Sequence, residues 1–103
     1  MNKVIETIRK TAEQIKTQGV SVILFGSQAR GDANEQSDWD VLVLIDKESI
    51  NDSDHERYVY PFWELGWKLN AMIHPIAYTL RQWKSHSRSP LYHNVEREGI
   101  VLC

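Results

Sequence analysis

The feature that most constrains this chain is a polar segment held between two short, strongly apolar ones. Residues 20–25 (VSVILF) and 39–45 (WDVLVLI) are rich in β-branched side chains, a composition typical of buried β-strands. The polar segment opens with Gly26 and Ser27, and Asp38 follows the serine after ten intervening residues. The sequence therefore predicts two buried strands whose ends bring a turn and an acidic group together.

The turn after the first strand has the residues that a phosphate-binding loop needs. Gly26 lacks a Cβ, so the backbone can approach a ligand closely at this position. The QAR segment that follows Ser27 can begin a helical turn, and free N–H groups at such a turn favour a phosphate. The Ser27 hydroxyl can add one more hydrogen bond. We therefore expect Gly26 and Ser27 to form a phosphate cradle.

The second strand begins with a pair of aspartates, Asp38 and Asp40, on either side of Trp39. Side chains two residues apart on a strand point to the same face, and the residue between them points to the other. Two adjacent carboxylates repel each other unless a cation lies between them, and hard oxygen ligands suit Mg²⁺. This pattern predicts a magnesium site at Asp38 and Asp40; the alternative is a capping role at the start of the strand.

The rest of the chain predicts a small α/β domain. Helical periodicity or helix signals mark residues 2–18, 54–70, 80–86 and 91–98. Residues 71–79 are predicted as a third strand, with Pro75 indicating an edge position or a bulge. Pro61 indicates either a kink or a late start of its helix. The order α-β-β-α-β-α predicts a small mixed sheet covered by helices, with residues 1–103 forming one domain.

Composition narrows the function classes. The chain has 103 residues, a net charge of −2 and one cysteine, Cys103. The absence of a basic excess argues against an extended nucleic-acid footprint. A chain with one cysteine has no internal disulfide, which fits a reducing compartment. No stretch approaches the roughly 18 apolar residues of a membrane span, so we expect a cytoplasmic protein without a membrane partner.

The segments GSQARG and SDWD together resemble the GS-x10-D-x-D signature of the nucleotidyltransferase superfamily, whose fold is that of DNA polymerase β. The resemblance covers most of the chain and is closest to the minimal nucleotidyltransferase group, short proteins often found beside a helical partner protein. It implies metal-dependent transfer of a nucleoside monophosphate from a nucleoside triphosphate, with ATP the expected one, to an acceptor hydroxyl. Gly26 and Ser27 would hold the β- and γ-phosphates, and Asp38 and Asp40 would hold Mg²⁺. Arg30 would stabilise the turn or contact phosphate.

One departure from the resemblance concerns the third strand. The superfamily usually carries a third carboxylate there, and residues 71–79 contain none. By alternation Asn70, Met72 and His74 share a face, and we expect Met72 or Asn70 in the position of the missing acid. His74 could act as a base near neutral pH.

Three hypotheses follow from this departure. The first is an active nucleotidyltransferase. The second is an antitoxin-like binding module with weakened catalysis that neutralises a helical partner. The third is a small domain with no nucleotide site.

Aromatic residues are concentrated in the second half of the chain. We expect them to lie mostly in the core, with base stacking or a partner surface as the alternatives. They are Tyr58, Tyr60, Phe62, Trp63, Trp67 and Trp83.

Overall fold

The computed structural model describes residues 3–34 and 37–103. Its centre is a four-stranded mixed sheet in the order β3-β2-β1-β4. β2 and β3 are parallel, whereas β1 is antiparallel to both of its neighbours. The strands are β1 (Val20–Phe25), β2 (Trp39–Ile45), β3 (Ile73–Thr79) and β4 (Ile100–Val101). The predicted α/β class with a mixed sheet is confirmed.

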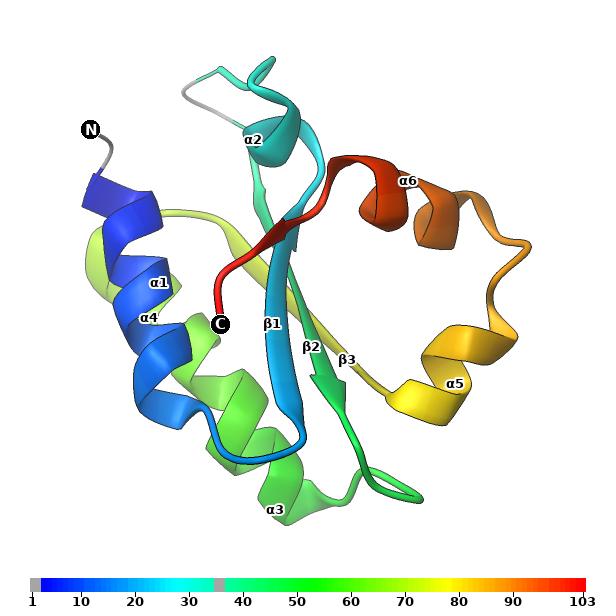
Figure 1. The fold of residues 1–103 in the computed structure, drawn as a ribbon. Coiled ribbons are helices and arrows are strands. Elements are labelled where there is room, and N and C mark those ends of the chain that lie inside the picture. The colour runs from blue at the N-terminus through cyan, green and yellow to red at the C-terminus, as the bar shows by residue number, and fades with distance from the viewer. Residues whose placement is uncertain (1–2, 35–36) are drawn as a thin grey trace.

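Helices cover both faces of this sheet (Figure 1). α1 and α4 lie on one face, and α5 and α6 lie on the other. The helical segments are α1 (Lys3–Ile15), α2 (Ser27–Arg30), α3 (Asp52–Asp54), the π-helical turn η1 (His55–Val59), α4 (Tyr60–Leu69), α5 (Leu80–Ser85) and α6 (Pro90–Glu98). Within the described ranges, none of these helices combines the length and the apolar character needed to cross a bilayer.

The face under α1 and α4 holds the larger core. Ile8 and Ala12 of α1 are fully buried there, on the stripe that the helical periodicity of residues 2–18 predicts; Asn2, the first residue of that range, lies outside the described residues. Trp39 is buried in the same layer, so the aspartates on either side of it belong to the opposite face. The direction predicted for Trp39 is therefore confirmed.

The face under α5 and α6 is only partly covered. Leu42 and Leu44 of β2 are buried there against Trp83 of α5 and Val95 of α6. The helices cover the start of β2 less completely. The side chains of Asp38 and His74 there are 44% and 39% exposed. This face therefore has an apolar half and an open polar half.

The predicted helix over residues 54–70 is divided into three consecutive parts. Asn51 and Asp54 form a reciprocal capping box at its start, and the π-helical turn η1 then leads into α4. Pro61 lies in the first turn of α4, where its missing N–H breaks no intrahelical bond. The helical run itself begins at Asp52, so Pro61 does not mark a late start; it directly follows the π-helical turn η1, where the regular α-helix is interrupted.

The third strand begins later than predicted. Asn70 ends α4 in the left-handed conformation, with φ of 52°, and its N–H bonds the Gly66 carbonyl. The strand then starts at Ile73, so Asn70 and Met72 lie outside it. β3 is one of the two edge strands of the sheet, which confirms the edge position indicated by Pro75. β4 was not predicted, because two residues carry no periodicity.

The aromatic residues divide between the core and the surface. Tyr58, Phe62 and Trp83 are buried as predicted. The core prediction is wrong for the other three, Tyr60, Trp63 and Trp67, which are 46%, 38% and 66% exposed. Tyr60 and Trp67 contact each other edge to face, with ring centroids 5.9 Å apart, whereas the Trp63 ring lies beside His74 of β3.

Candidate functional site

Strand pairing brings the predicted turn directly beside the predicted acids. The antiparallel register of β1 and β2 pairs Phe25, the last residue of β1, with Asp40. Gly26 is the next residue along the chain and therefore lies beside that aspartate. Gly26 has φ of +80°, and a Cβ placed on it would overlap Oδ2 of Asp40. The carboxylate thus fills the space that a side chain at position 26 would need, and glycine fits both requirements.

Ser27 begins α2, which is a single helical turn of four residues. The Gly26 carbonyl accepts hydrogen bonds from the N–H groups of Ala29 and Arg30, both at 3.1 Å. The turn closes at Gly31, whose N–H bonds the Ser27 carbonyl at 3.0 Å. The segment is therefore a compact backbone loop that stands over the start of β2.

Asp38, Asp40 and His74 lie together on the open half of the sheet. Asp40 pairs with His74 across the parallel β2–β3 register, and His74 Nδ1 is 3.6 Å from Asp38 Oδ2. Burial, and then the charge of Asp38, raise the pKa of Asp40, while His74 and Arg30 act in the opposite direction. The second aspartate is thus held where its negative charge is unfavourable without a cation nearby.

His74 is the residue of β3 that pairs with Asp40, whereas Asn70 and Met72 lie outside that strand. Asn70 caps α4, and Met72 precedes β3, with its carbonyl accepting the Trp39 N–H at 2.8 Å. The expectation that these two residues share a strand face with His74 is wrong, because the left-handed cap at Asn70 delays the start of β3 to Ile73; which residue replaces the missing acid stays a prediction. Alternation alone placed His74 on the right face, but only the pairing register shows that it is opposite Asp40.

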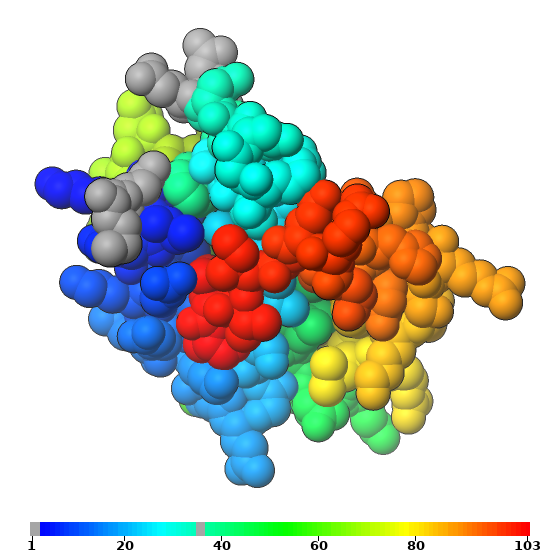
Figure 2. Space-filling model, turned by 45° about the horizontal axis from the view of Figure 1, so that its top comes forward, coloured from blue at the N-terminus to red at the C-terminus, as the bar shows by residue number. Residues whose placement is uncertain are grey.

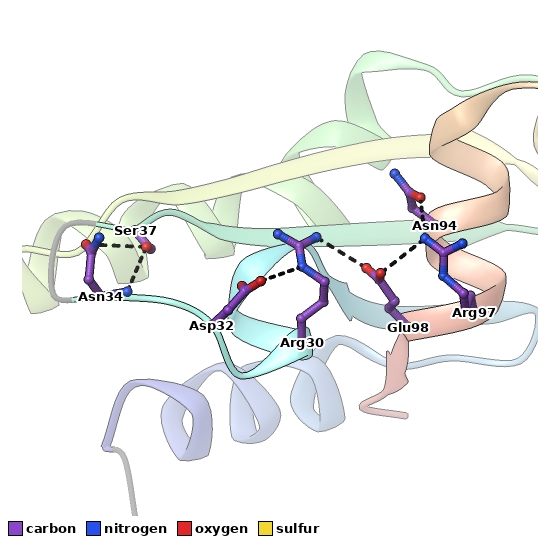
Figure 3. A network of polar contacts seen from close by, with 7 residues as sticks. All are labelled: Arg30, Asp32, Asn34, Ser37, Asn94, Arg97 and Glu98. Atoms are coloured by element: carbon purple, nitrogen blue, oxygen red, sulfur yellow. Dashed lines mark hydrogen bonds and ion pairs between the residues drawn. The ribbon is translucent and has the colours of Figure 1, made fainter.

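Arg30 connects the turn to α6 (Figure 3). Its Nε donates to Asp32 Oδ2 at 3.0 Å and its Nη1 to Glu98 Oε2 at 3.2 Å. These hydrogen bonds, that to Asp32 first, raise the pKa of Arg30 further. Arg97 donates to the same Glu98 carboxylate at 3.2 Å. Arg30 thus has a structural role, in which it binds Asp32 within the loop and Glu98 of α6. Its contact with phosphate stays a prediction.

The space-filling view shows the turn and α6 side by side on one surface of the molecule (Figure 2). On the far side of the turn, Asn34 N–H donates to Ser37 Oγ at 2.9 Å (Figure 3). Hydrogen bonds therefore hold the segment after β1 at two points: Arg30 binds Glu98 of α6, and Ser37 binds Asn34 within the segment.

The donor set fits a divalent cation. As their side chains stand, no three histidine, cysteine or acidic groups among residues 3–34 and 37–103 converge closely enough to enclose a metal ion. Magnesium, however, commonly takes one or two carboxylates and completes its shell with substrate phosphates and water. Asp38 and Asp40 supply those carboxylates, and the missing Cβ at Gly26 lets the Asp40 carboxylate lie directly against the turn.

Comparison with known proteins identifies the family of the chain. The family described as "Nucleotidyltransferase domain" matches residues 5–91. The match spans most of the chain, and the protein therefore belongs to this nucleotidyltransferase family, a family of transferases.

Particular relatives support the assignment. "Putative protein adenylyltransferase MJ0141" of Methanocaldococcus jannaschii is 32% identical over 97% of this chain and 99% of its own length. A solved structure described as a "putative minimal nucleotidyltransferase" has a TM-score of 0.61 at 26% identity, over 95% of this chain and 92% of that chain. A crystal structure described as "the toxin-antitoxin with AMP-PNP" has a TM-score of 0.65 at 20% identity, over 99% of this chain and 73% of that chain. The last likeness concerns the fold alone.

Proposed function

We propose that this protein transfers AMP from ATP to a hydroxyl group of a partner protein, with Mg²⁺ held by Asp38 and Asp40. The observation that carries the proposal is the fit between the bare Gly26 turn and the Asp40 carboxylate, which occupies the space of a missing Cβ. The turn and the acid are thus built as one unit. The choice of AMP and of a protein acceptor rests on the relative named as a protein adenylyltransferase.

The residues of the site have separable tasks. The Gly26–Ser27 backbone and the Ser27 hydroxyl would bind the β- and γ-phosphates, and Asp38 and Asp40 would hold the cation. A bound divalent cation supplies charge neutralisation at the phosphate oxygens, which with positioning is most of the catalysis in phosphoryl transfer. Arg30 adds a positive charge that already acts on Asp40.

The reaction balances without any further reactant. The acceptor oxygen forms a bond to the α-phosphorus of ATP, and the bond between that phosphorus and the oxygen bridging to the β-phosphate breaks. Pyrophosphate leaves, and the proton of the hydroxyl passes to solvent. The product is AMP joined to the acceptor by a phosphodiester.

The position of a radiolabel in ATP tests this proposal. The protein is incubated with Mg²⁺, ATP and a candidate acceptor, the first choice being any small helical protein that a neighbouring gene encodes. Label at the α-phosphate should become covalently attached to the acceptor protein, whereas label at the γ-phosphate should leave as pyrophosphate. Attachment of the γ-label would indicate a kinase, and attachment of neither label to any protein would contradict a protein acceptor.

Matched variants locate the activity. Asp38→Asn and Asp40→Asn should each lower the rate at least about a hundredfold, because each removes a charge worth several kcal/mol in the transition state. Asp46→Asn is the control, since Asp46 is an exposed aspartate just beyond the opposite end of β2. An equal loss in all three variants would argue against a site at the start of the strand.

A second candidate is an antitoxin-like binding module with weakened catalysis. The observation that favours it is that the residue of β3 paired with Asp40 is His74, and that this strand lacks the carboxylate expected on it. The toxin-antitoxin structure with the same fold suggests a toxin as the kind of partner. If the double variant Asp38→Asn/Asp40→Asn still neutralises the helical partner in cells, binding alone is sufficient and this second function holds.

A further inference from the structure

Asp38 and His74 form a carboxylate–imidazole pair at the edge of the candidate site. Oδ2 of the aspartate and Nδ1 of the histidine are 3.6 Å apart. Both side chains are accessible from outside, with exposed fractions of 44% and 39%. Asp38 is the residue directly before β2, and His74 belongs to β3. The register of the two strands places His74 beside Asp40.

The separation of these two atoms suits two ligands of one ion. Bonds of about 2.1 Å place neighbouring ligands of an octahedral ion about 3 Å apart, so a small closing movement of the pair is sufficient. The Trp63 ring lies beside the imidazole, with its centroid 6.0 Å from that of His74. The pair is thus close to a ligating arrangement before any cation binds.

An imidazole changes which ion such a site prefers. Carboxylates, phosphates and water are the usual ligands of Mg²⁺, whereas imidazole nitrogen is a ligand for first-row transition ions. We propose that His74 is a direct ligand of the catalytic cation together with Asp38, and that this nitrogen makes the site prefer transition ions such as Mn²⁺ over Mg²⁺. The inference rests on the proposed function, because it concerns the same cation.

The test uses Mn²⁺ as a spectroscopic probe. The whole protein is loaded with Mn²⁺ and a non-hydrolysable ATP analogue, and pulsed electron paramagnetic resonance detects nitrogen nuclei bonded to the metal. We expect an imidazole nitrogen coupling in the parent protein, its loss in His74→Gln, and its retention in His93→Gln. His93 is the matched control because it is an exposed histidine on α6.

Calorimetry gives an independent measure of the preference. His74→Gln should lower the ratio of Mn²⁺ to Mg²⁺ affinity about tenfold or more, a typical cost of altering a metal shell. His74→Asp should lose the nitrogen coupling and bind Mg²⁺ more tightly than the parent does, since it restores an oxygen ligand. Circular dichroism of each variant shows that the fold is retained.

The outcomes separate this inference from the proposed function. Bound Mn²⁺ that depends on Asp38 and Asp40 but shows no nitrogen coupling would overturn the role of His74 and leave the metal site in place. An unchanged affinity ratio in His74→Gln would overturn it as well. No stoichiometric binding of either ion, with or without the nucleotide analogue, would overturn both.

Discussion

The two faces of the sheet differ in how completely they are covered. Under α1 and α4, side chains such as Val22, Val41 and Val43 are fully buried along the whole length of the strands. Under α5 and α6, burial is complete at Leu42 but is lost toward Asp38 and His74. One face is thus a closed core, while the other keeps polar groups accessible at one end.

If the proposed site is correct, the closed face contributes mainly stability and the open face carries the chemistry. A closed apolar layer contributes in proportion to the area it removes from water. The open half gives up part of that contribution, because it holds two carboxylates of the same charge close together. Substitutions on the two faces should therefore affect different measurements.

The largest effect is expected on the closed face. Phe62 is fully buried, and Phe62→Ala should lower the free energy of unfolding by about 3–5 kcal/mol through lost burial and the cavity left behind. Urea denaturation measures this loss, and Leu91→Ala on the partly buried face should cost less. Equal losses in the two variants would contradict the division between the faces.

A pair of glycines tests the open face. Gly26 and Gly31 have nearly the same φ, +80° and +84°, but only a Cβ at Gly26 would meet Asp40. Gly31 is in the left-handed conformation, so Gly31→Ala should cost about 1–2 kcal/mol in stability. Gly26→Ala should cost more, because Gly26 has ψ of −159°, in a region that is essentially restricted to glycine, and its Cβ would overlap Asp40. Nucleotide binding measured by calorimetry should be lost in Gly26→Ala alone, and loss in both would indicate that backbone strain is responsible.

The smallest effect concerns the pH dependence of stability. The pKa of Asp40 is raised in the folded state, by burial first and by Asp38 second. A raised pKa contributes stability below the unfolded-state pKa, and this is lost as the pH rises through the folded-state pKa. Without metal, Asp40→Asn should therefore stabilise the protein slightly at neutral pH, by less than about 1 kcal/mol for a group this accessible, and the gain should vanish in acid.

The pKa of Asp54 is shifted in the opposite direction to that of Asp40, so Asp54 serves as the comparison. Hydrogen bonds from Lys47 Nζ, and then from the Asn51 N–H, hold the pKa of Asp54 below its usual value. Its contribution is present above the unfolded-state pKa and is lost as the pH falls through the folded-state pKa. Asp54→Asn should thus destabilise the protein at neutral pH, and denaturation curves from pH 4 to pH 8 should show the two variants diverging in opposite directions.

Local patterns in the sequence were sufficient for much of this architecture. The β-branched runs at 20–25 and 39–45 predicted β1 and β2 with the observed bounds, since both strands are buried and lack competing signals. The spacing of Gly26 and Ser27 from Asp38 and Asp40 predicted the turn and the acids together. Their closeness in the structure follows from the antiparallel register of the two strands.

Features that depend on partners distant in the sequence could not be predicted in this way. The position of His74 opposite Asp40 depends on where β3 begins, and that depends on the left-handed cap at Asn70. The exposure of Trp63 and Trp67 depends on which side of α4 meets the sheet. β4 exists because residues 100–101 pair with Ile23 and Leu24, a contact that so short a segment does not reveal.

The pairing of β1 with β2 implies an order in which the site is assembled during folding. These strands are neighbours in the chain, so the loop that closes them is short, whereas β3 joins only after the crossover through α3, η1 and α4. Short loops close at a lower entropic cost than long ones, and an edge strand is among the first elements to open. A partly folded chain should therefore already hold the Gly26 turn against Asp40 while still lacking His74, and amide hydrogens should exchange faster in β3 than in β2.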